Sequence, residues 1–120
     1  YVFNSYLVLR TSSKSGKDES IRNLYKLPQT HRTMMVFEAT AAAVFTFDHV
    51  DAHYWFSEEN LKYNSENQAV WKAVRGEVAV DRHMGDVANY LYADGHVAAI
   101  PADQISEWCA AGENFARPPR

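Results

Sequence analysis

The sequence has little cysteine, no excess of positive charge and no long apolar run, and each shortage excludes a class of protein. Its single cysteine, Cys109, cannot form a disulfide within the 120-residue chain, so the fold has no internal covalent cross-link. Lys and Arg number 12 against 15 Asp and Glu, and the net charge of −3 argues against a phosphate-binding surface. No apolar run approaches the ~20 residues that span a bilayer.

The motifs of several enzyme classes are also missing. The sequence has no glycine-rich phosphate loop, no nucleophile elbow and no paired cysteine motif. Cys109 has no basic neighbour in sequence and lies on a predicted apolar helix face, which favours a buried, inert thiol. The remaining composition, with 47% hydrophobic and 22% charged residues, is typical of a globular protein. We therefore expect residues 1–120 to form one globular domain.

The strongest local signal lies in residues 82–100, where Asp94-Gly95 separates two apolar-rich runs. Asp followed by Gly favours a two-residue type I′ hairpin turn, because both turn positions need a positive φ. Such a turn places two sets of side chains on opposite faces. One face would hold Leu91, Ala93, His96, Ala98 and Ile100, and the other Tyr90, Tyr92, Val97 and Ala99. Both sets are largely apolar, so we expect the hairpin to lie inside the fold or to be covered by a partner.

Other segments complete a prediction of secondary structure. Residues 1–9, 33–39, 43–47 and 76–80 are predicted as strands, with 33–39 central and 41–43 ambiguous between helix and strand. A capping box at 65–68 precedes an apolar helix face of Val70, Trp71 and Val74. A second helix is predicted from about 101 to 111, ending at Gly112. Residues 11–20 are predicted as a polar loop and 113–120 as a wandering tail. The expected fold class is α+β, an antiparallel sheet with the hairpin near its centre and a short C-terminal helix.

Residues 82–97 also resemble a family signature. Arg82-His83, then Gly85, then Asn89-Tyr90-Leu91-Tyr92-Ala93-Asp94-Gly95-His96-Val97 is similar to the C-terminal motif of a bacterial family. That family is the prepilin-type processing-associated H-X9-DG domain, named for His, nine residues and Asp-Gly. Ten residues separate His83 from Asp94 here, which suggests a one-residue insertion near Asp86. The run from Pro28 to Glu38 is similar to the strand that precedes the motif in the family.

The resemblance implies a non-enzymatic structural subunit, the head of a pilin-like or type II secretion pseudopilin-like protein. In that family a cleaved leader and a long apolar helix precede the head, so we expect this chain to be the head alone. The implied location is the bacterial cell envelope or surface, outside the cytoplasm. The implied partners are other pilin-like subunits through the helix and proteins of the envelope or secretion machinery, with no nucleic acid. The motif residues His83, Asn89, Asp94, Gly95 and His96 would then be structural, with no catalytic residue.

Two groups of side chains suggest metal binding as an alternative. In an extended segment, His49, Asp51 and His53 would lie on one face, as metal ligands require. His83, Asp94 and His96 surround the hairpin and are also of ligand type. The simpler interpretations are a polar loop edge for the first group and a turn stabilised by the Asp94 side chain for the second. Neither group makes a closed four-ligand shell, so we expect no cofactor to be needed for folding. A calcium ion held by carbonyls and by Asp48, Asp51 or Asp94 stays open, because pseudopilin heads of the resembled type can use calcium.

Aromatic residues are the last feature of the sequence. They occur at Tyr54-Trp55-Phe56, Trp71, Tyr90, Tyr92 and Trp108. If these side chains are exposed, they would bind sugars or partner proteins. If they are buried, they would form the core. Three functional classes therefore remain: a structural subunit, a metal-dependent enzyme using His49/Asp51/His53 or His83/His96, and a carbohydrate- or protein-binding β module. An upstream apolar helix would favour the first, stoichiometric metal the second and an aromatic-lined groove the third.

Overall fold

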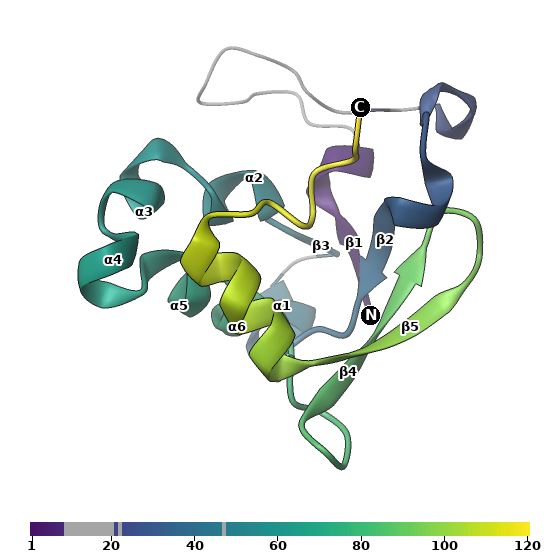
Figure 1. The fold of residues 1–120 in the computed structure, drawn as a ribbon. Coiled ribbons are helices and arrows are strands. Elements are labelled where there is room, and N and C mark those ends of the chain that lie inside the picture. The colour runs from purple at the N-terminus through teal and green to yellow at the C-terminus, as the bar shows by residue number, and fades with distance from the viewer. Residues whose placement is uncertain (9–20, 22, 47) are drawn as a thin grey trace.

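The fold is built on a five-stranded sheet with the strand order β3-β1-β2-β4-β5 (Figure 1). The computed structural model describes residues 1–8, 21, 23–46 and 48–120. The strands are β1 (Val2–Asn4), β2 (Met34–Phe37), β3 (His49–Val50), β4 (Val87–Tyr92) and β5 (Val97–Pro101). Neighbouring strands are antiparallel except β1 and β3, which are parallel. The α+β class and the mostly antiparallel sheet are confirmed, but the hairpin of β4 and β5 lies at one end of the strand order.

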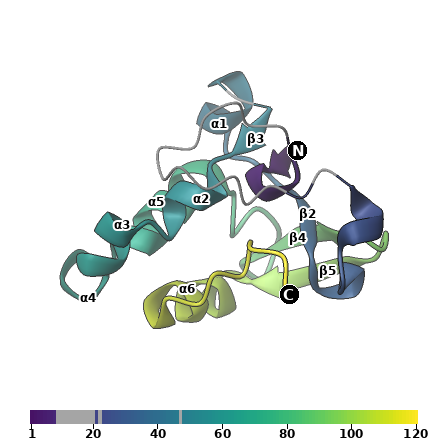
Figure 2. The ribbon, with the colours of Figure 1, turned by 90° about the horizontal axis from the view of Figure 1, so that it is seen from above.

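The helices of the described residues gather mainly on one side of β2, β4 and β5 (Figure 2). They are α1 (Ala41–Thr46), α2 (Ala52–Trp55), α3 (Glu58–Lys62), α4 (Asn64–Asn67), α5 (Ala69–Glu77) and α6 (Ala102–Ala111). Short 3₁₀ helices are η1 (Ser5–Leu7), η2 (Leu24–Lys26) and η3 (Thr30–Arg32). None of these helices is long and apolar enough to cross a membrane.

The core lies between the helices and one face of the sheet. Its fully buried side chains come from both layers and include Phe37, Val50, Trp55, Val70, Val74, Tyr90, Ile105 and Cys109. The ring of Phe37 contacts Trp55 edge-on at 5.7 Å and Tyr90 edge-on at 5.9 Å, measured between ring centroids. Edge-to-face contacts of this kind add to the free energy gained by burying the rings. The core therefore joins the sheet to α2 through aromatic side chains.

The β4–β5 hairpin forms as predicted, but its register differs by one residue. Leu91 pairs with Val97, and Tyr90 pairs with Ala98. Because side chains alternate along a strand, this shift changes which of them share a face. Leu91 and Val97, predicted on opposite faces, both lie on the outer face, whereas Tyr90 and Ala98 share the face toward the core.

The register differs because the turn has three residues, 93–95, instead of two. The backbone N–H of Tyr92 donates to the carbonyl of His96 at 2.9 Å, which closes a three-residue loop. Gly95 has a φ of 93°, and Asp94 is not among the residues with positive φ. This is the three-residue turn that ends in a left-handed glycine, so the predicted type I′ turn is wrong.

The Gly95→Ala variant should lower the free energy of unfolding by roughly 1–2 kcal/mol, the cost of a left-handed residue that carries a Cβ. Apart from its chain neighbours, no described residue has an atom within 4 Å of the position of a Cβ at Gly95, so the cost comes from the backbone and not from a clash. Asp94→Ala should cost less. Thermal melts of the two variants and the wild type measure the difference. A Gly95→Ala melt that matches the wild type would contradict the assigned turn.

Strand β2 is the central strand of the sheet, as predicted for residues 33–39, but a bulge changes its faces. Met34 pairs with Tyr92, and the register shifts before Val36. A bulge adds one residue to one strand and reverses the alternation beyond it. Met34 and Phe37 are consequently both buried, although strict alternation placed them on opposite faces.

Two segments predicted as strands have other structures. Residues 43–46 belong to helix α1, whose start is stabilised because the backbone N–H of Ala43 donates to the Thr40 hydroxyl at 3.2 Å. Residues 76–80 make only an isolated bridge, at Val78, because α5 continues to Glu77. Both strand predictions are therefore wrong.

The two predicted helices are present, with one wrong cap. The face of α5 is correct, since Val70 and Val74 are fully buried. Its start is different, because Ser65 lies inside α4, and Gln68 is left-handed with a φ of 56° and has no capping hydrogen bond from its side chain. Helix α6 matches its prediction, and Gly112 ends it with a φ of 70°.

The chain ends are held more closely than predicted. The strand predicted for residues 1–9 stops at Asn4, where the 3₁₀ turn η1 begins. The side-chain amide of Asn4 donates to the carbonyls of Met34 at 2.8 Å and Ala116 at 2.7 Å. Ala116 is 1% exposed, so the tail does not wander. The polar loop predicted for residues 11–20, and Phe47, lie outside the described residues.

Candidate functional site

Residues 82–89, the first half of the segment that resembles the family motif, make internal contacts at the start of β4. The carboxylate of Glu38 is 4% exposed, and both of its oxygens lie 2.9 Å from Nε2 of His83. The same carboxylate accepts the backbone N–H of Asn89 at 2.7 Å. Beside it, the guanidinium of Arg82 donates to the Ala39 carbonyl at 2.5 Å. These bonds tie the end of β2 to the start of β4.

The second half of the motif stabilises the hairpin turn. The carboxylate of Asp94 accepts the backbone N–H of His96 at 3.1 Å, and Nδ1 of the same histidine lies 2.5 Å from it. The backbone hydrogen bond from His96, followed by the side-chain one, holds the pKa of Asp94 below its usual value. The His96 ring stacks on Tyr92 at 4.2 Å. Asp94 therefore stabilises the turn backbone, which is the simpler of its two predicted roles.

The motif residues do not converge on one metal site. His83 lies at the start of β4, bridged to Val87, whereas Asp94 and His96 lie at its far end. Within the part of the chain that the structure describes, no group of three or more His, Cys, Asp or Glu side chains is placed to hold a metal ion. The alternative in which His83 shares a metal ion with Asp94 and His96 therefore does not match their positions.

The alternation of His and Asp at residues 49–53 is broken by secondary structure. His49 lies in β3, but helix α2 begins directly after Asp51, so the segment is not extended throughout. Nδ1 of His49 lies 2.7 Å from the carboxylate of Asp48. Nδ1 of His53 lies 2.9 Å from the Ser5 hydroxyl. The three candidate ligands thus do not lie on one extended segment, which the metal alternative requires.

Cys109 is a buried thiol, as predicted from its place on the apolar face of α6. It is 0% exposed, and burial raises its pKa to about 12. A thiol needs its thiolate form to act as a nucleophile or a metal ligand. Cys109 is therefore part of the core.

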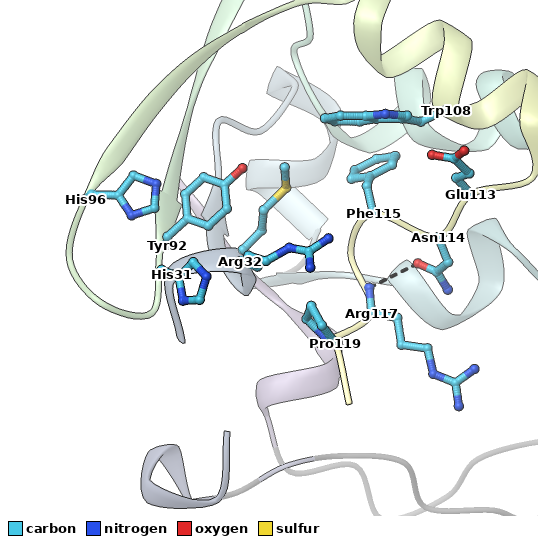
Figure 3. A pocket seen from close by; sticks show the side chains of 11 residues that line it. His31, Arg32, Tyr92, His96, Trp108, Glu113, Asn114, Phe115, Arg117 and Pro119 are labelled. Carbon is cyan, nitrogen blue, oxygen red and sulfur yellow. Dashed lines mark hydrogen bonds between the residues drawn. The ribbon is translucent and has the colours of Figure 1, made fainter. Parts of the chain in front are cut away.

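A hollow of about 400 Å³ opens between η3, the β4–β5 turn, the end of α6 and the tail (Figure 3). Its lining includes Arg32, Tyr92, Trp108, Phe115 and Arg117. In Figure 3, Arg32 extends across the hollow toward Phe115, and Trp108 lies above the Phe115 ring. The centroids of these two rings are 5.8 Å apart. This is an aromatic hollow with positive charge, of a size typical of small-ligand sites.

Sequence reasoning found only part of this hollow. Tyr92 and Trp108 were among the aromatic candidates, but Arg32, Phe115 and Arg117 were not expected near them. Arg32 follows a segment with weak signals, and the other two lie in the tail that was predicted to wander. The useful signal was the aromatic and basic composition of the tail itself.

The outer face of the sheet carries an apolar row. Phe3 pairs with Val36, Val36 with Leu91, and Leu91 with Val97, so the row crosses β1, β2, β4 and β5. Phe3 is 50% exposed and Val97 is 60% exposed. Beside them, a mostly apolar groove of about 360 Å³ is lined by part of this row together with Tyr1 and Asn89. A contiguous apolar patch on a protein surface can mark an interaction site.

Comparisons of the chain with protein-family models, with curated proteins and with solved structures return no match. The interpretation of function therefore depends on the contacts of this chain's own residues. Three features are available for it: the Glu38–His83 contact, the aromatic hollow and the apolar row.

Proposed function

We propose that the chain is the head of a non-enzymatic, pilin-like structural subunit of the bacterial cell envelope, similar to a type II secretion pseudopilin. The apolar row across β1, β2, β4 and β5 is the observation that carries the proposal. In the family that residues 82–97 resemble, an apolar helix precedes the head. A helix of that kind entering at Tyr1, which lines the groove beside the row, would cover the row and remove it from water.

The motif contacts support a structural role for the resembled residues. His83 and Asn89 both bond to the buried carboxylate of Glu38, a residue of the segment that is similar to the family's preceding strand. Asp94 and His96 bond to each other within the turn. Both halves of the motif are thus engaged in holding β2, β4 and β5 together. The partners of such a subunit are other pilin-like subunits, and its location is outside the cytoplasm.

The test is the behaviour of the full-length gene product in cells that produce it. We expect it in the membrane or sheared-filament fraction. A Val97→Asp variant should keep its melting temperature, because Val97 is 60% exposed, but should be lost from that fraction, since a charge would face the apolar helix. Leu61→Asp is the matched control. Leu61 is 42% exposed on α3, away from the row, and its substitution should leave the fraction unchanged.

Two results together would refute the proposal. The first is a full-length product that stays in the cytosolic fraction with or without Val97→Asp. The second is turnover of a small substrate that His49→Ala or His83→Ala abolishes. An enzyme using these histidines would then replace the structural subunit.

A further inference from the structure

The aromatic hollow continues into a second hollow on the tail. The second one measures about 370 Å³ and shares Asn114, Arg117 and Pro119 with the first. It also carries Arg120. The two hollows thus form one elongated surface that begins at η3 and runs along the tail, a shape that suits an extended ligand better than a compact one.

Positive charge is concentrated on this surface although the chain as a whole is acidic. The net charge of the chain is −3. Among the described residues that line the two hollows, Arg32, Arg117 and Arg120 are basic and Glu113 is the one with a carboxylate side chain. The Arg32 guanidinium donates to the neutral side-chain oxygen of Gln29 at 3.1 Å, and Arg32 makes no ion pair with another described residue. A guanidinium aimed into a hollow in this way is suited to a carboxylate, which it binds through two N–H groups.

The aromatic side chains give the same surface an affinity for rings. Tyr92, Trp108 and Phe115 reach the hollow from β4, α6 and the tail, and each of them is only partly buried. Such side chains combine an apolar body with, for Tyr and Trp, a polar tip. They suit a ligand whose ring has an apolar face and a polar edge. Among the three functional classes that the sequence leaves open, an aromatic-lined groove favours the carbohydrate- or protein-binding module.

From these observations we propose that the surface binds an acidic glycan, with the carboxylate of a uronic acid residue on Arg32 and its ring against the aromatic side chains. A sugar acid carries one charge per ring, which the Arg32 guanidinium can match. A nucleic acid carries far denser charge, and its partners are usually basic domains. The net charge of −3 and the pI near 5.9 therefore favour the glycan. This site is separate from the apolar row, so it does not depend on the proposed structural role.

The test is a titration followed by the amide and indole N–H signals of the protein, with sodium glucuronate as the probe. Two control compounds each lack one of its groups. Glucose has the sugar ring without the carboxylate, and acetate has the carboxylate without the ring. We expect saturable shifts with glucuronate at Trp108 and at most weak shifts at Trp71 on α5. Glucose and acetate should each bind at least about fivefold more weakly, because each lacks one of the two contacts.

Arg32→Gln should weaken glucuronate binding about tenfold, the effect of losing charge-assisted hydrogen bonds. Lys72→Gln is the matched control, because it removes one positive charge from an exposed position on α5 and should change binding by less than about twofold. Both variants should melt like the wild type. This titration does not depend on cell fractionation. The proposal of a glycan site and the proposal of a structural role can therefore be refuted separately.

Three results would each overturn the proposal. One is the absence of shifts at Trp108 up to about 20 mM glucuronate, a concentration that fills a site of even millimolar Kd. Another is acetate binding as tightly as glucuronate, which would leave only a site for small anions. The third is a single-stranded oligonucleotide binding more tightly than an oligouronate of equal length at equal salt, which would make the ligand a nucleic acid.

Discussion

Replacing Trp55 with alanine is expected to lower the free energy of unfolding by about 3–5 kcal/mol. The side chain is 0% exposed and contacts the rings of Phe37 at 5.7 Å and Phe115 at 6.0 Å. Its indole N–H donates to the carboxylate of Glu77. The substitution leaves a cavity among the sheet, α2 and the tail and removes a hydrogen-bond donor. Because small domains have only ~5–15 kcal/mol of stability, the variant should be close to unfolding at room temperature.

Denaturant unfolding followed by circular dichroism measures this loss. Trp71→Ala is the matched control, since Trp71 is only partly buried and its ring lies 5.5 Å from the Arg75 guanidinium carbon on the same helix. We expect Trp71→Ala to lose less than half as much free energy of unfolding as Trp55→Ala. Trp55→Phe should fall between the two, because it keeps a ring but not the N–H. A Trp55→Ala variant as stable as Trp71→Ala would mean that α2 does not depend on this contact.

The sequence predicted those elements whose signals are local. Helix α6 has its apolar residues at Ile105 and Cys109 and a glycine at its end, and each of these signals lies within one segment. The same is true of the buried face of α5 and of the hairpin around Gly95. Such elements follow from periodicity and from residues that favour a turn or a cap, without knowledge of the rest of the chain.

Register could not be predicted, because both faces of the hairpin are apolar. A one-residue change in turn length decides whether Val97 or Ala98 shares a face with Leu91, and the sequence offers no polar side that would forbid either arrangement. The same ambiguity concealed the bulge after Met34 in β2. Where a strand lacks a polar face, its pairing is decided by contacts with other elements. The apolar row on the outer face was therefore visible only in the structure.

The candidate sites could not be predicted for a different reason, because the residues that form each of them lie far apart in the sequence. Glu38 and His83 are separated by 45 positions, and the aromatic hollow combines η3, β4, α6 and the tail. Motif reasoning found His83 and assigned Asp94 to the turn, but it could not say which group His83 would meet. The metal hypothesis at residues 49–53 needed an extended chain, and the start of α2 ended that extension.

Replacing Glu38 with alanine is expected to lower the free energy of unfolding by about 2–3 kcal/mol. Its carboxylate is 4% exposed and is the acceptor for both His83 and the backbone N–H of Asn89. Without it, the Asn89 N–H loses its acceptor at a position that water reaches poorly, and an unsatisfied buried donor costs more than the net strength of the bond. Loss of the bond to His83 costs less free energy, because the His83 side chain is 43% exposed and water can replace the carboxylate as its partner. Denaturant unfolding at neutral pH measures the change.

Two further variants separate the hydrogen bonds from the loss of side-chain bulk. Glu38→Gln keeps an oxygen that can accept the Asn89 N–H, so it should recover most of the stability that alanine loses. Glu66→Ala removes an exposed carboxylate on α4 and should change stability by less than about 0.5 kcal/mol. If Glu38→Gln were as damaging as Glu38→Ala, the stabilising element would be the negative charge beside His83, and the pair would act as an ion pair. If neither variant lost stability, the bonds between β2 and the start of β4 would not hold the sheet together, and the structural role proposed for the motif would lose its support.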